Sequence, residues 1–244
     1  MPITIAIADP GGWGEGLQAA FDELHRIDAV FSPFRPESQI GRINSGLLEL
    51  DQADPEVKAV LELCRLYQIR CQGYFSVWLG GRLDPSGLVK GWALERAAQI
   101  LLSAGARNLL VDGAGDILAL GEAEPGRPWR VGVRHPREPA RTVRVIAAHN
   151  LAVATSGTYE RGAHIVEPNT GLAAEHWVSL TVTGPDMVEA DVLATAACAM
   201  GPTGLDFLNT VPGYDGFGID RELRAHWTAG FEHRLAPARS GADV

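Results

Sequence analysis

The stretch Leu109-Leu-Val-Asp-Gly-Ala-Gly-Asp-Ile-Leu-Ala-Leu120 decides the fold class. Two apolar runs, 109–111 and 117–120, flank a short turn of glycines and aspartates. Apolar runs joined by such a turn are typical of two paired strands in a β-hairpin. A tight hairpin is therefore our first interpretation of this turn, and a ligand-binding loop is the alternative.

Further strands and a few helices lie on both sides of this hairpin. Alternating or short apolar runs predict strands at 3–7, 129–134, 143–147, 151–154 and 179–183, and a final pair near 216–219 and 223–228. Apolar residues at helical spacing predict helices at 14–31, from Asp54-Pro55 to Gly73, and at 90–103 and 187–200. Strands interrupted by isolated helices predict an α+β fold with mainly antiparallel sheets and packed helices. We expect one domain over residues 1–235 and a polar tail over 236–244.

The composition excludes several function classes. The chain has 244 residues, of which 46% are hydrophobic and 21% charged, and its formal net charge is −9. It has no cluster of lysine and arginine, which argues against a nucleic-acid partner. We see no signal peptide and no apolar window of about 18 residues, so we expect no membrane insertion. The three cysteines show no CxxC spacing and favour a reducing compartment, and we expect a cytoplasmic protein.

The segment Asp84-Pro-Ser-Gly-Leu-Val-Lys-Gly-Trp-Ala93 lies where the third predicted helix begins. Gly87 and Gly91 permit close approach of another backbone, and a helix N-terminus offers free N–H groups to an anion. Lys90 adds a positive charge, and Lys58 is the only other lysine of the chain. The segment is consistent with an anion site or with an aspartate that caps the helix.

Two polar loops follow the predicted strand at 151–154. The first is Ala154-Thr-Ser-Gly-Thr-Tyr-Glu-Arg161, and the second is His164-Ile-Val-Glu-Pro-Asn-Thr-Gly171. Polar loops between apolar strands are favoured positions for binding groups. His164 can accept a proton near neutral pH, although a histidine can also serve a purely structural role.

Asp191 and Thr195 lie four residues apart in the last predicted helix, so their side chains share one face. The helix is otherwise largely apolar, and a carboxylate in such a helix needs a partner. No lysine lies near Asp191 in the sequence. Because Mg²⁺ binds carboxylate and neutral oxygens, we favour a metal site here. The alternative is a partly exposed Asp191, with Thr195 hydrogen-bonded back to its own helix.

Taken together and in order, these segments resemble the ApbE family of FAD:protein FMN transferases. The resemblance also includes the run Phe31-Ser-Pro-Phe-Arg-Pro-Glu-Ser-Gln-Ile-Gly-Arg-Ile-Asn44 and the turn Gly73-Tyr-Phe75, and it covers roughly residues 20–205. It implies the α+β fold of that family, with FAD as substrate and Mg²⁺ bound at the FAD pyrophosphate.

The resemblance also implies roles for individual residues. The residues implied to contact FAD are Phe34, Gly73, Tyr74, Phe75, Asp84, Lys90 and Leu180. The groups implied to hold Mg²⁺ are the backbone carbonyl of Gly87 and the side chains of Asp191 and Thr195. His164 matches the histidine implied to be the base that activates the acceptor hydroxyl.

The implied reaction is attack by a Thr or Ser hydroxyl of an acceptor protein on the FMN phosphorus of FAD, with release of AMP. The chain lacks the family acceptor pattern Asp-Gly-x-Thr/Ser-Gly-Ala-Thr, so we expect the acceptor to be another protein. Two alternatives are an FAD pyrophosphatase that produces FMN and AMP, and a non-catalytic FAD-binding protein.

Two features depart from the family pattern. Family members usually open with a strand that carries Met-Gly-Thr, and this sequence starts at the next strand. We therefore expect either a missing start or a more open flavin pocket. Ser76 also stands where the family usually has Asp.

Overall fold

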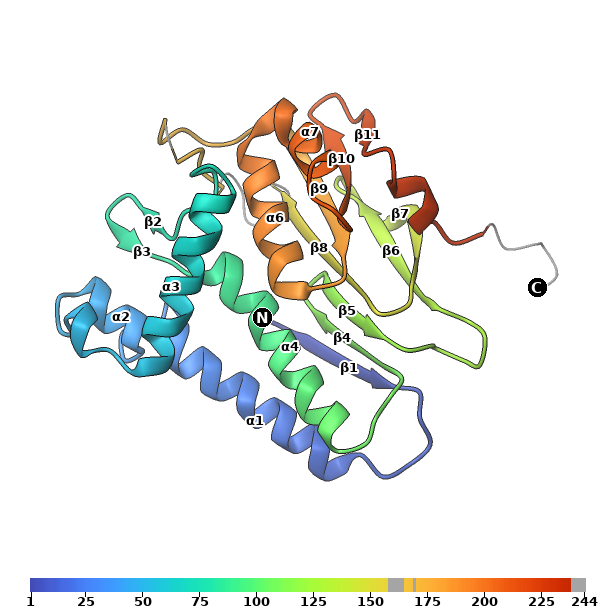
Figure 1. Ribbon diagram of the computed structural model, residues 1–244, viewed down its shortest axis with the longest axis horizontal. Coiled ribbons are helices and arrows are strands. Elements are labelled where there is room, and N and C mark those ends of the chain that lie inside the picture. The colour runs from blue at the N-terminus through green and yellow to red at the C-terminus, as the bar shows by residue number, and fades with distance from the viewer. Residues whose placement is uncertain (158–164, 169, 238–244) are drawn as a thin grey trace.

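A seven-stranded sheet with the order β1-β4-β5-β8-β9-β10-β11 organises the protein (Figure 1). The structure is a computed structural model that describes residues 1–157, 165–168 and 170–237. The strands of this sheet are β1 (Ile3–Ile7), β4 (Leu109–Gly113), β5 (Asp116–Leu120), β8 (Leu151–Gly157), β9 (Trp177–Gly184), β10 (Asp215–Asp220) and β11 (Ala225–Trp227). Every neighbouring pair is antiparallel, as the sequence predicts.

The remaining elements surround this sheet. Two further hairpins pair β2 (Trp78–Leu79) with β3 (Arg82–Leu83), and β6 (Trp129–His135) with β7 (Glu138–Ala148). The α-helices are α1 (Gly14–Phe31), α2 (Gln39–Asn44), α3 (Pro55–Arg70), α4 (Ser86–Ser103), α6 (Met187–Ala199) and α7 (Gly204–Asn209). Short 3-10 helices lie at Leu50–Gln52, Gly201–Thr203 and Phe231–Arg234. No helix in the described part of the chain is long and apolar enough to cross a membrane.

The β4–β5 connection is the tight hairpin that we expected. Gly113 pairs with Asp116, so only Ala114 and Gly115 form the loop. Both have positive φ, at 57° and 101°, which is the left-handed conformation of favoured two-residue hairpin turns. The Asp112 carboxylate accepts a hydrogen bond from the Gly115 N–H at 2.8 Å and holds the turn together.

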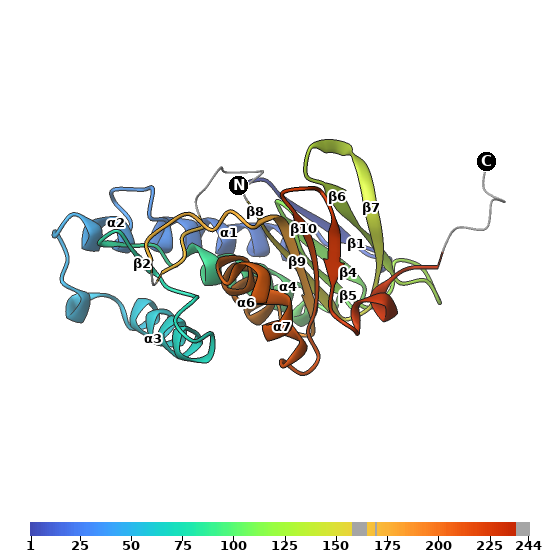
Figure 2. The same ribbon diagram turned by 90° about the horizontal axis from the view of Figure 1, so that it is seen from above.

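The two faces of the sheet carry separate hydrophobic clusters. Helices α1, α4 and α6 cover one face, and the β6–β7 hairpin lies on the opposite side (Figure 2). Alternation along β8 illustrates the division, since Ala152 and Ala154 belong to the cluster under the helices. Leu151 and Val153 belong to the cluster under the hairpin. Residues adjacent in β8 therefore pack into different hydrophobic clusters on opposite faces of the sheet.

Some predicted boundaries differ from the observed ones. Helix α4 begins at Ser86, four residues before the expected start, because the Asp84 carboxylate accepts the Ser86 N–H at 2.9 Å and fixes the first turn. Strand β8 continues to Gly157, and β7 begins at Glu138. Short elements such as α2 and α7 were not predicted, because six residues are too few to show a helical period.

Candidate active site

Gly91 allows helices α4 and α6 to lie in close contact. A Cβ atom on Gly91 would lie 2.7 Å from the Met187 carbonyl oxygen, so only glycine permits this approach. The N–H of Gly91 also donates a hydrogen bond of 3.0 Å to Asp191 Oδ2. The expectation that Gly91 permits close backbone approach is therefore correct, and the approaching backbone is that of α6.

Lys90, Asp116 and Asp191 form a charged cluster between α4, β5 and α6. The Lys90 Nζ contacts Asp116 Oδ2 and lies 3.3 Å from Asp191 Oδ1. The two carboxylate side chains are each 2% exposed, and that of Lys90 is 24% exposed. No lysine lies near Asp191 in the sequence, but the fold brings in Lys90 from a distant segment as its basic partner. The alternative of a partly exposed Asp191 is wrong.

The cluster shifts the proton affinity of its members. Burial raises the pKa of Asp191, the charge of Lys90 opposes that shift, and Asp116 adds to it. Burial alone would lower the pKa of Lys90, but Asp116 and Asp191 outweigh it and raise that pKa. Lys90 is therefore positively charged at neutral pH. With both carboxylates ionised, one ammonium faces two negative charges, and the cluster carries a net negative charge.

Asp116 is a site residue that sequence reasoning did not identify. Its Oδ1 accepts a hydrogen bond of 2.8 Å from the Thr155 N–H, while Oδ2 faces Lys90. The sequence signal for Asp116 was the second aspartate of the DGAGD turn. The tight hairpin uses only the first, Asp112, which accepts the Gly115 N–H. Asp116 links Lys90 to strand β8, the strand that leads into residues 158–164.

A second contact group lies further toward the start of α4. A Cβ on Gly87 would lie 3.3 Å from Thr195 Oγ1 and 3.3 Å from Phe75 Cε2. Thr195 Oγ1 in turn lies 3.4 Å from Ser156 Oγ on β8. The structure thus brings together Gly87 and Thr195, which the family resemblance implies as Mg²⁺ ligands, and Phe75, which it implies as an FAD contact.

The other residues implied to contact flavin have different surroundings. Gly73, with φ of 84°, turns the chain after α3, and Tyr74 is half-buried in that turn. Phe34 is 79% exposed. Leu180 is fully buried in the core under the helices, so its side chain offers no surface to a ligand. His164 lies outside the described residues.

The oxygen donors fit a hard cation. Asp191 supplies a buried carboxylate, and Thr195 supplies a hydroxyl on the same face of α6, next to Gly87. Among the described residues, no three His, Cys, Asp or Glu side chains are grouped as a metal site. That is compatible with Mg²⁺, which commonly takes one or two carboxylates and completes its shell with water and substrate phosphates.

Comparison with known proteins gives a consistent family. The profile described as the ApbE family matches residues 1–81 and 78–217. An FAD:protein FMN transferase of Treponema pallidum is 30% identical over 211 residues, which are 75% of this chain and 58% of that protein. One of the same name from Vibrio cholerae is 35% identical over 129 residues, which are 49% of this chain and 39% of that protein. The chain therefore spans less than two thirds of the length of either relative.

Solved structures show the same fold. The flavin transferase ApbE from Vibrio cholerae aligns with a TM-score of 0.81 at 22% identity, over 96% of this chain and 95% of that one. The ApbE protein from Thermotoga maritima aligns with a TM-score of 0.84 at 22% identity, over 96% of this chain and 95% of that one. The α+β architecture with antiparallel sheets and packed helices is thus confirmed.

Proposed function

Because the chain belongs to the ApbE family, we propose that it is an FAD:protein FMN transferase, which moves FMN from FAD to a Thr or Ser hydroxyl of an acceptor protein and releases AMP. The observation that carries the proposal is the cluster of Lys90, Asp116 and Asp191 beside Gly87 and Thr195. It combines a fixed positive charge with oxygen donors, which is the combination that a pyrophosphate and its metal ion require.

Lys90 is the group proposed to face a phosphate oxygen of FAD. Its raised pKa keeps it charged at neutral pH. Asp116 restrains the ammonium from the β5 side, so the charge is held in position before substrate arrives. A preorganised charge of this kind stabilises the negative charge that develops during phosphoryl transfer. Asp84 is also proposed to contact FAD, as are Phe34 and the turn Gly73-Tyr74-Phe75.

Asp191, Thr195 and the Gly87 carbonyl are the groups proposed to hold Mg²⁺. When bound, Mg²⁺ would neutralise charge on the phosphate oxygens. The Gly91 N–H orients the Asp191 carboxylate from one side, and the apolar remainder of α6 keeps water away from it. A cation at this position would favour the ionised form of Asp191, whose pKa burial raises.

His164 is proposed as the base that takes the proton of the acceptor hydroxyl. An imidazole with an ordinary pKa of about 6.5 is suited to accept a proton near neutral pH. This role comes from the family resemblance alone. The partners are FAD and an acceptor protein, and residues 1–235 are proposed to form the single catalytic domain. The three free, buried cysteines support a reducing compartment, and we infer the cytoplasm.

The test is incubation of the purified protein with FAD, Mg²⁺ and a candidate acceptor protein. We expect AMP release, measured by chromatography, and an acceptor mass increased by one phosphoester-linked FMN. AMP release that continues at full rate without acceptor would identify an FAD pyrophosphatase instead. FAD binding without AMP release under any condition would identify a non-catalytic binding protein.

A further inference from the structure

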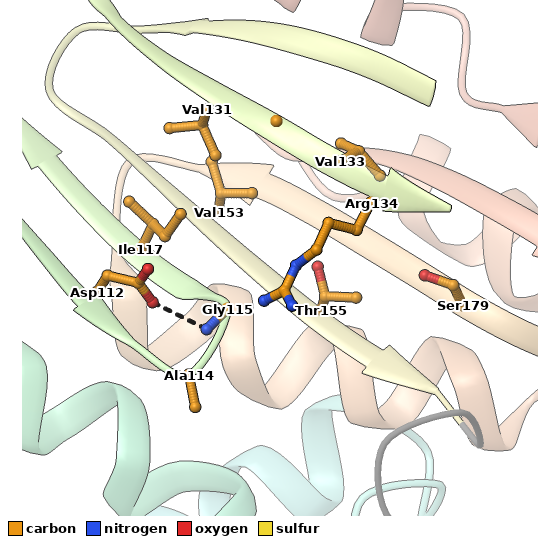
Figure 3. Close-up of a pocket in the computed structure, with 11 residues that line it drawn as sticks. Asp112, Ala114, Gly115, Ile117, Val131, Val133, Arg134, Val153, Thr155 and Ser179 are labelled. Carbon is orange, nitrogen blue, oxygen red and sulfur yellow. Dashed lines mark hydrogen bonds between the residues drawn. The ribbon is translucent and has the colours of Figure 1, made fainter. Parts of the chain in front are cut away.

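A pocket lies on the face of the sheet opposite the charged cluster. It has a volume of about 240 Å³ and lies between the β4–β5 turn, strands β8 and β9, and the β6–β7 hairpin (Figure 3). Ile117, Val131 and Val153 give it an apolar wall. Pockets for nucleotide-sized ligands are typically about 300–1,000 Å³, so this one is better matched to a single side chain than to FAD.

Arg134 supplies the positive charge of this pocket. The β6–β7 ladder is irregular on both sides of Arg134, between Val133 and Arg134 and between Arg134 and His135. Such irregularities redirect side chains, and the guanidinium of Arg134 extends across the pocket towards Gly115 and Thr155 (Figure 3). Within the part of the chain that the structure describes, Arg134 has no ion-pair partner.

Ser179 supplies a hydroxyl to the same pocket. It is 2% exposed and lines the cavity, yet its hydroxyl has no hydrogen-bond partner among the described residues. Because the pocket reaches this hydroxyl, it can donate a hydrogen bond to a ligand oxygen there. Thr155 lies beside it, with its Oγ1 2.9 Å from Thr181 Oγ1.

Asp112 is the acidic residue of the pocket. Its carboxylate accepts the Gly115 N–H and is not ion-paired with Arg134 in the described structure. A carboxylate suits the guanidinium of Arg134 and the hydroxyl of Ser179, because an arginine can donate two parallel hydrogen bonds to a carboxylate. Asp112 weakens that attraction but leaves the donors of Arg134 available.

We propose that this pocket binds an acidic side chain of the acceptor polypeptide and thereby positions the acceptor. The inference rests on the proposed function for the identity of the polypeptide. Ser179 pairs with Gly157, the last residue of β8, and the chain continues from there through 158–164 to His164. A polypeptide anchored at Ser179 and Arg134 would thus be held at the end of the strand that leads to the proposed base.

The direct test uses small probes without FAD or Mg²⁺, so its outcome does not depend on catalysis. Capped aspartate (N-acetyl-aspartate amide) is titrated into isotope-labelled protein, with capped asparagine as the neutral control. We expect capped aspartate alone to shift the amide NMR signals of Gly115, Thr155 and Ser179. Arg134→Gln should weaken this binding about 2- to 5-fold, because an ion pair made by an exposed arginine contributes up to about 1 kcal/mol.

A matched control is Arg130→Gln, on the same strand but outside the pocket lining, which should leave the titration unchanged. Asp112→Asn keeps an acceptor for the Gly115 N–H and removes the opposing charge, so it should tighten binding several-fold. Amide shifts of equal size with capped asparagine would overturn the proposal. Equal shifts of the parent and Arg134→Gln with capped aspartate would also overturn it. A stronger response to inorganic phosphate than to capped aspartate would show a phosphate site and would also refute it.

Activity separates this inference from the proposed function. If the function is correct, Arg134→Gln should raise the KM for the acceptor protein and leave FAD affinity and the kcat of FMN transfer close to those of the parent. Absence of AMP release by the parent protein would count against the proposed function. An unchanged acceptor KM in Arg134→Gln would count against the acceptor role of the pocket.

Discussion

The backbone N–H of Gly91 donates a 3.0 Å hydrogen bond to Asp191 Oδ2, although Gly91 lies inside helix α4. This bond ties the two helices of the site together at the carboxylate itself. It depends on the absence of a side chain at residue 91, because the backbone of α6 occupies that space. The close approach at Gly91 therefore both packs the two helices together and orients the Asp191 carboxylate.

Gly91→Ala should destabilise the protein by about 1–3 kcal/mol, because the added methyl group would force α4 and α6 apart. The greater helix propensity of alanine offsets about 1 kcal/mol of the steric cost. Urea unfolding measures the difference. Gly14→Ala is the control, since a Cβ there meets no atom within 4 Å, and it should be neutral or slightly stabilising. Equal stability of both variants would show that the helices adjust freely.

Lys90→Met should destabilise the protein by about 3–5 kcal/mol, since it leaves Asp116 and Asp191 buried without their cation. The pKa of Asp191, already raised, should rise further. A carboxyl group whose pKa is raised in the folded state lowers the free energy of unfolding of the protein as pH rises. The destabilisation of Lys90→Met should therefore grow from pH 5 to pH 8. Unfolding at several pH values measures it. Lys58→Met, at the only other lysine, should cost little.

Much of the fold is encoded in local patterns. The predicted helix at 14–31 is observed with the same bounds, and the hairpin at Ala114-Gly115 is observed as predicted. Both depend on signals that lie within one short segment, namely helical spacing and turn glycines. The extent of β8 was underestimated, because Thr155-Ser156-Gly157 is polar and reads as a loop. Tertiary pairing with β9 makes it a strand.

The candidate site was predictable only in part. Asp191 and Thr195 share a helical face, which their spacing of four residues reveals. The pairing of Asp191 with Lys90 joins residues about a hundred positions apart, and no local pattern encodes it. The role of Asp116 was hidden for the same reason, because a turn aspartate and a buried ion-pair partner look identical in the sequence.

Asp191→Asn should raise the Mg²⁺ concentration needed for half-maximal AMP release, because an amide is a weaker ligand than a carboxylate. The fold should survive, since the amide oxygen can still accept the Gly91 N–H. Thr195→Val should shift the curve in the same direction but less, and it also removes the contact with Ser156. Mg²⁺ titrations of AMP release measure both. Curves that superimpose on the parent curve would remove the metal assignment.

His164→Ala should lower the rate of FMN transfer by about 10²–10⁴-fold, the usual cost of losing a general base. FAD binding, measured by calorimetry, should remain close to that of the parent. His149→Ala is the control, because His149 is exposed at the turn between β7 and β8 and should not affect the rate. Transfer at the parent rate in His164→Ala would show that another group takes the proton.

Asp220 gives a prediction of acid stability that is independent of the active site. The residue is 1% exposed at the end of β10, and its Oδ2 lies 2.9 Å from both Arg224 Nε and His226 Nε2. Burial alone would raise its pKa, but the hydrogen bonds from His226 and Arg224 outweigh burial and lower the pKa from 3.8 to about 2. The folded state therefore favours the ionised form.

A carboxyl group with a lowered pKa stabilises the folded state above its ordinary pKa, and that contribution is lost as pH falls through the folded-state value. Asp220→Asn should therefore destabilise the protein at pH 5 to 7, and the difference from the parent should shrink between about pH 4 and pH 2. Urea unfolding midpoints over this range measure it. Asp51→Asn, at an exposed aspartate, should follow the parent curve throughout. If the difference between Asp220→Asn and the parent stays constant from pH 6 to pH 2, the ion pairs of Asp220 do not stabilise the fold through its charge.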